Sequence, residues 1–149
     1  LERIDRTYDR HRAWTGQDLK GHVPSELFKE HVITCFIDDP VGVRNREQIG
    51  IDMITWECDY PHSDAAWPDA PECLEVELAG LSDADVDAIT HENAIRLFAY
   101  DPFSIRPKEQ STVGALRAEV AGHDVEIRSS GQTMSGARTA AEIQATATA

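Results

Sequence analysis

The sequence lacks any apolar run that approaches the roughly 20 residues of a membrane-spanning helix, and no signal peptide opens it. Cysteine is scarce: the chain has 3, an odd number, and none of them forms a Cys-x-x-Cys pair. A disulfide framework and a zinc knuckle are therefore excluded. We expect a cytoplasmic protein that does not bind a membrane.

Positive charge is also scarce, with 14 Lys and Arg against 27 Asp and Glu and a net charge of −13. The imbalance lies in residues 1–103, which hold 9 Lys and Arg against 22 Asp and Glu, whereas residues 104–149 hold 5 of each. Nucleic-acid binding needs clustered Lys and Arg, so the composition predicts no nucleic-acid partner. The shift in charge coincides with a change of pattern, which divides the chain into 1–103 and 104–149.

Two short apolar runs have the length and composition of buried strands, at residues 32–37 and 53–58. The segment between them, 41–49, reads as a helix that Gly50 stops. A strand, a helix and a strand joined by short links are typical of parallel sheets. We therefore expect a right-handed strand–helix–strand unit whose strands are parallel and adjacent.

Polar residues follow both predicted strands, at the edge where parallel α/β sheets keep their chemistry. Asp59 and His62 follow the second strand. Asp38 and Asp39 follow the first, where Asp before Pro40 favours a helix N-cap over a catalytic role. His31 falls at the opposite, amino end of the first strand, where we expect a structural or surface role. Cys35 reads as a small buried apolar residue.

Helical patterns surround this unit. A helix with one buried apolar stripe runs from Leu1 to about Trp14 and ends at Gly16, and a long one begins after the N-cap Ser82 and runs to about Tyr100. Asn93 shares the apolar stripe of the long helix. A buried amide needs partners, so we expect it to bond backbone near the second strand, the alternative being direct substrate contact. Shorter helices are expected at 24–29, 72–79 and 113–120, an edge strand at 124–128, and a flexible tail from about residue 129.

The second predicted strand and the residues that follow it resemble a known family. Trp56-Glu57-Cys58-Asp59-Tyr60-Pro61-His62 and the later Trp67-Pro68 resemble the strand-eight signature of the metal-dependent amidohydrolases. The branch that includes aminocarboxymuconate-semialdehyde decarboxylase is the most similar. Matching pieces in the same order are Pro24-Ser25-Glu26-Leu27-Phe28, Asp38-Asp39-Pro40-Val41-Gly42, and Ile89 to Phe98 with Asn93-Ala94.

The resemblance implies an α/β fold, with residues 1–103 forming the carboxyl-terminal part of a (β/α)₈ TIM barrel, including strands seven and eight. It implies that Asp59 binds a divalent metal, zinc in the first instance, or carries a proton. A TIM barrel needs roughly 250 residues, so we expect a carboxyl-terminal fragment whose remaining metal ligands lie upstream. The implied activity of the longer enzyme is hydrolysis or non-oxidative decarboxylation of a small carboxylate-bearing molecule.

Several roles stay open on the sequence alone. His62 could orient Asp59, bind a substrate carboxylate, or hold the loop. Glu57 and Cys58 stand where many relatives carry small residues, which leaves the exact substrate undecided. The rival interpretation is a non-catalytic acidic interaction or structural domain. A small-molecule substrate is expected, and homo-oligomerisation is left open.

Overall fold

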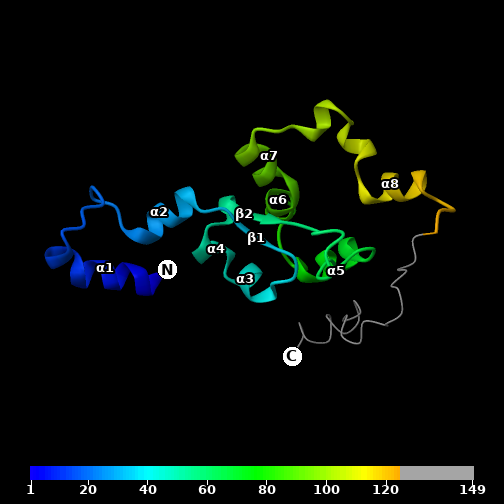
Figure 1. Ribbon diagram of the computed structural model, residues 1–149. Coiled ribbons are helices and arrows are strands. Elements are labelled where there is room, and N and C mark those ends of the chain that lie inside the picture. Colours follow the sequence, from blue (N-terminus) through cyan, green and yellow to red (C-terminus); the bar gives the residue numbers. More distant parts are fainter. Residues whose placement is uncertain (125–149) are drawn as a thin grey trace.

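The computed structural model describes residues 1–124 and is mostly helical, with a two-stranded sheet near its centre (Figure 1). The elements in chain order are α1 (Glu2–Thr15), α2 (Pro24–His31), β1 (Thr34–Phe36), α3 (Pro40–Arg44), α4 (Arg46–Ile49), the 3₁₀ turn η1 (Ile51–Met53), β2 (Ile54–Trp56), α5 (Ala70–Glu77), α6 (Asp83–Asp87), the π-helical turn η2 (Ala88–Glu92), α7 (Asn93–Phe98), the 3₁₀ turns η3 (Pro102–Ser104) and η4 (Lys108–Gln110), and α8 (Val113–Glu119). Apart from Asp124, the predicted edge strand and tail lie outside the described residues. No helix within residues 1–124 is long and apolar enough to cross a membrane.

The two strands are parallel and adjacent, as the sequence predicts, with Thr34 opposite Ile54 and Phe36 opposite Trp56. Each strand is shorter than predicted. It begins later than predicted because a helical turn takes up a backbone N–H group that precedes the strand. The N–H of Val32 donates to the carbonyl of Phe28 at 2.9 Å and closes α2. The N–H of Met53 likewise donates to the carbonyl of Gly50 at 3.0 Å and closes η1.

His31 is the last residue of α2, and its exposed side chain agrees with the structural or surface role expected of it. One expectation about the first strand is wrong. Cys35 is exposed rather than buried. Neighbouring residues of a strand point to opposite faces. Phe36 packs against the core, so Cys35 faces the other side of β1, where it is exposed although Thr55, opposite it on β2, is buried.

The hydrophobic core lies between the sheet and the helices that follow each strand. Its buried members are Val43 of α3, Ile54 of β2, Ile89 of η2, and Leu78 just after α5. Partly buried side chains pack around them: Phe36, Ile49, Ile51, Trp56, Leu74, Leu81 and Val86. Ile89 is the most deeply buried, at 1% exposed. The buried stripe predicted on α1 is wrong, since α1 has no buried residue.

The helix predicted over 41–49 is present as two short helices that meet at Asn45. The side chain of Asn45 donates to the carbonyl of Val41 at 2.7 Å, and its own N–H also bonds back to that turn. Asn side chains compete in this way with the regular helical pattern. The N-cap role of Asp39 is confirmed, because its Oδ1 accepts the N–H of Gly42 at 2.8 Å.

The long helix after Ser82 is present as α6, η2 and α7. Ser82 Oγ accepts the N–H of Asp85 at 3.2 Å, as expected of the N-cap. The helix ends at Ala99, which has a left-handed φ of 50°. The π-helical turn η2 in its middle is not predicted by the sequence pattern.

Asn93 joins this helix to the start of β2. Its side chain is 3% exposed, and its Nδ2 donates to the carbonyls of Ile51 at 2.8 Å and Ile54 at 2.9 Å. Arg96 donates to Asn93 Oδ1 at 3.2 Å, so every hydrogen-bonding group of the amide is used. The predicted bond of Asn93 to backbone beside the second strand is confirmed.

Residues after α7 return to the body of the molecule. In Figure 1 the chain swings away after α7 and comes back so that α8 lies on the side of α5. Arg117 of α8 forms a two-pronged ion pair with Glu72 of α5, with Nη1–Oε1 at 2.5 Å and Nη2–Oε2 at 2.8 Å. Bidentate pairs of this kind fix orientation as well as distance.

Replacing Asn93 should be costly, because the two carbonyls it satisfies lie in a buried part of the fold. We expect Asn93→Ala to lower the free energy of unfolding by about 2–4 kcal/mol, the sum of lost bonds and unsatisfied groups. Urea unfolding followed by circular dichroism measures it. The matched control is Asn45→Ala, an exposed amide that should cost less than about 1 kcal/mol. Equal losses in the two variants would contradict the anchoring role of Asn93.

Candidate functional site

The first candidate residue, Asp59, lies three residues after β2, at the carboxyl end of the sheet. The ladder continues one step past the strand, since the N–H of Glu57 donates to the carbonyl of Phe36 at 3.0 Å. Asp59 then turns the chain with a left-handed φ of 52°, which Asp tolerates better than most residues. Its side chain is 35% exposed, so it is reachable from solvent while partly shielded.

The second candidate residue, His62, contacts Asp59 directly. His62 Nδ1 lies 2.6 Å from Asp59 Oδ2, and the backbone N–H of His62 donates to the Asp59 carbonyl at 2.8 Å. When Asp59 is ionised its oxygens can only accept, so Nδ1 must carry the hydrogen. The structure thus brings the two residues together in the arrangement in which His62 orients Asp59. The imidazole is 73% exposed, which leaves Nε2 accessible.

Asp59 and His62 provide fewer donors than a metal site requires. Catalytic zinc is normally held by three protein ligands. Asp59 Oδ1 makes no hydrogen bond to another part of residues 1–124, so it is available as one ligand. His62 uses Nδ1 for Asp59 and keeps Nε2 as a possible second donor. The two residues therefore supply at most two of the three ligands of a zinc site.

An aromatic pair accompanies Asp59 in the loop between β2 and α5. The rings of Tyr60 and Trp67 lie 5.1 Å apart, centre to centre, and are tilted by 48°. Both remain well exposed, Tyr60 at 63% and Trp67 at 40%. Trp67 therefore contacts the residue directly after Asp59 through its ring.

A carboxylate that the sequence pattern did not reveal lies at the end of the neighbouring strand. Glu77, the last residue of α5, accepts the backbone N–H of Asp39 on its Oε1 at 2.5 Å. Burial, and to a smaller extent the charges of Asp38 and Asp39, raise the pKa of Glu77 to about 7 against the opposing effect of that hydrogen bond. Glu77 lies 38 residues from Asp39 in sequence, so no local spacing signals the contact.

A second group that the sequence did not reveal lies on the long helix. Asp87, His91 and Glu92 each offer one ligand atom, and these atoms lie within 4.8 Å of one another. The Nδ1 of His91 lies 3.1 Å from the hydroxyl of Thr90, and Glu92 is exposed. Carboxylates at such helical spacings are common on an acidic surface. This group therefore does not identify a metal site by itself.

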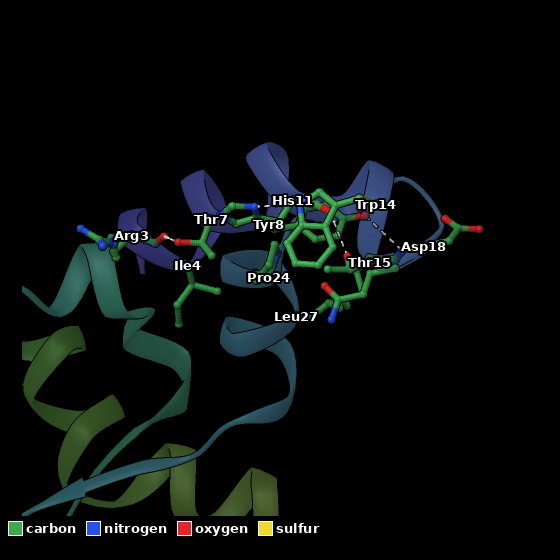
Figure 2. A pocket seen from close by; sticks show the side chains of 12 residues that line it. Arg3, Ile4, Thr7, Tyr8, His11, Trp14, Thr15, Asp18, Pro24 and Leu27 are labelled. Atoms are coloured by element: carbon green, nitrogen blue, oxygen red, sulfur yellow. Dashed lines mark hydrogen bonds between the residues drawn. The ribbon is translucent and has the colours of Figure 1, made fainter.

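A hollow in the structure is far along the chain from Asp59. It has a volume of about 870 Å³ and lies between α1 and α2 (Figure 2). Its walls include Tyr8, His11, Trp14 and Leu27, and the indole N–H of Trp14 bonds to His11 Nδ1 at 3.0 Å. Asp59 and His62 do not line it, so its size does not support the site at the sheet.

Comparison with known proteins gives one family. The family described as amidohydrolase matches residues 6–99, a span that covers more than half of the chain and includes both strands, Asp59, His62 and Asn93. No curated protein matches the chain.

The backbone at Asp59 restricts which substitutions leave the loop intact. Asp59→Asn should retain the turn, since Asn also tolerates positive φ, whereas Asp59→Val should lower the free energy of unfolding by about 1–2 kcal/mol more. Urea unfolding of both variants tests this difference. Equal stabilities would show that the left-handed conformation is not maintained in solution.

Proposed function

The chain belongs to the amidohydrolase family, and on that premise we propose that it supplies the catalytic carboxylate, Asp59, of a metal-dependent hydrolase or non-oxidative decarboxylase. The substrate we propose is a small molecule that bears a carboxylate, as in the decarboxylase branch that the signature resembles. The observation that carries the proposal is the placement of Asp59 at the carboxyl end of β2, hydrogen-bonded to His62 at 2.6 Å.

The proposed architecture is the last part of a (β/α)₈ barrel. Its support is the parallel pairing of β1 with β2, with Asp39 following the carboxyl end of β1 and Asp59 following that of β2. Barrel enzymes carry their catalytic groups at that end of the sheet. Two strands do not close a barrel, so the proposal assigns the remaining strands and metal ligands to polypeptide beyond this chain.

Asp59 and His62 have separate tasks in this proposal. A divalent metal, zinc in the first instance, would supply Lewis acidity and lower the pKa of bound water. Asp59 would take the metal or a proton on Oδ1, the oxygen that His62 does not engage. His62 would fix the carboxylate through Oδ2 and disfavour its rotation. Proton transfer by a positioned carboxylate contributes typically 10²–10⁴-fold in rate.

Activity of a full-length enzyme that carries this chain tests the role of Asp59. Asp59→Asn should preserve the fold and lower kcat/KM by about three orders of magnitude or more, because it removes both a ligand and a proton acceptor. The matched control is Asp64→Asn, an exposed carboxylate in the same loop, which should retain near-normal activity. Comparable activity of the Asp59→Asn and Asp64→Asn enzymes would refute the proposal. Release of CO₂ from the substrate distinguishes decarboxylation from hydrolysis.

The 149-residue chain alone should bind zinc weakly and show no turnover, since Asp59 provides one ligand where three are needed. Equilibrium dialysis against zinc, followed by metal analysis, measures this. Zinc retained at a stoichiometric level, and lost in Asp59→Asn, would show that the chain builds a complete site of its own.

A further inference from the structure

Glu77 makes a contact that joins two segments distant in sequence. It ends α5, and its Oε1 lies 2.5 Å from the backbone nitrogen of Asp39, in the turn after β1. The Glu77 side chain is partly buried, whereas its partner Asp39 is exposed. Hydrogen bonds from a backbone N–H to a carboxylate are among the stronger ones in proteins.

The turn that receives Glu77 is itself fixed. Asp39 uses its own side chain to cap α3, accepting the N–H of Gly42 at 2.8 Å. A Cβ on residue 42 would collide with the Asp39 carboxylate, so the glycine permits this close approach. The N–H of Asp39 is therefore held in one direction, and Glu77 meets a rigid donor.

The contact between Glu77 and Asp39 also helps to hold the two ends of the loop that carries Asp59. Residues 57–69, called here the Asp59 loop, begin where β2 ends and finish where α5 begins. Pairing with β1 fixes the first end of the loop. The second end moves with α5, whose first residue, Ala70, is 4% exposed. Glu77 links α5 to the turn after β1 through Asp39. Both ends of the Asp59 loop are therefore held in place relative to β1.

We propose that Glu77 is a positioning residue that holds α5, and with it the far end of the Asp59 loop, against the turn after β1 according to its protonation state. The bond between Glu77 and the N–H of Asp39 is called here the latch. The effect of the latch on catalysis rests on the function proposed for Asp59, whereas the latch itself does not. A protonated carboxyl can still accept the N–H of Asp39, and it removes the repulsion among neighbouring carboxylates.

Burial of the Glu77 carboxyl sets the direction of the response, and the charges that face it act in the same direction. Asp38 and Asp39 face it from the β1–α3 turn, and Cys73 lies one turn earlier on α5. Burial raises the pKa of the Cys73 thiol, and the carboxylates of Asp69, Asp38, Glu72 and Glu77 raise it further. Arg117, on α8, pairs with Glu72.

The sign of the pH dependence follows from linkage. The pKa of Glu77 is about 7 in the folded chain, above its ordinary 4.5. Stability from the latch is therefore complete below about pH 4.5 and is lost as pH rises through 7. Linkage between these two pKa values makes opening of α5 about tenfold more favourable at about pH 8.5 than at about pH 6. Screening of the charges by solvent makes this factor smaller.

Hydrogen exchange of the 149-residue chain tests the latch, with rates corrected for the intrinsic pH dependence of exchange. Protection of the α5 amides should fall three- to tenfold between about pH 6 and about pH 8.5. Glu77→Gln keeps an acceptor without charge, so its α5 should stay protected at both pH values. The matched control, Glu75→Gln, changes an exposed carboxylate on the same helix and should behave like the wild type. Glu77→Ala should lose protection at both pH values.

The outcomes separate the latch from the catalytic proposal, because exchange needs neither metal nor substrate. A pH-dependent loss in the wild type that Glu77→Gln abolishes supports the latch even if Asp59→Asn leaves activity intact. The same pH dependence in Glu77→Gln, no pH dependence in the wild type, or an α5 that exchanges without protection at both pH values would each overturn it.

Discussion

The side-chain amide of Asn93 joins the long helix to the point where β2 begins, and the placement of the sheet depends on it. Its two hydrogens reach the carbonyls of Ile51 and Ile54, on either side of the turn that starts the strand. Those carbonyls lie in a buried region where water cannot replace the amide. Ile89, one helical turn earlier, packs into the same core, so a polar and an apolar contact fix the same helix on the same strand.

The position of Asp59 follows from this anchor through a short chain of contacts. Asn93 fixes the start of β2, and pairing with β1 fixes its direction and register. Three residues later the chain turns at Asp59, where a left-handed backbone and the bond to His62 define the orientation of the carboxylate. Few residues separate the anchor from the catalytic candidate, so little freedom accumulates between them.

Local signals in the sequence predicted the parts of the fold that local chemistry controls. Ser82 and Asp39 cap helices as their residue types favour, and the amide of Asn93 found backbone partners because a buried polar group must. The local patterns did not predict several features that depend on contacts between residues distant in sequence. The strands are short because helical turns take up the backbone N–H groups before them, Cys35 lies on the face of β1 that points away from Phe36 and the core, and Glu77 meets Asp39 only after folding. The role of Asp59 rests on its position and family, while its bond to His62 required the structure.

The two ends of the sheet are stabilised by different physics, and this difference bears on function. At the amino end, a neutral amide satisfies neutral carbonyls, which is independent of pH and of ions. At the carboxyl end, Asp38, Asp39 and Glu77 gather with like charge, and the pKa of Glu77 rises to about 7 in response. Crowded carboxylates cost stability unless a proton or a cation relieves them. The carboxyl end therefore responds to protons through Glu77, whereas the amino end is held by contacts that do not depend on pH.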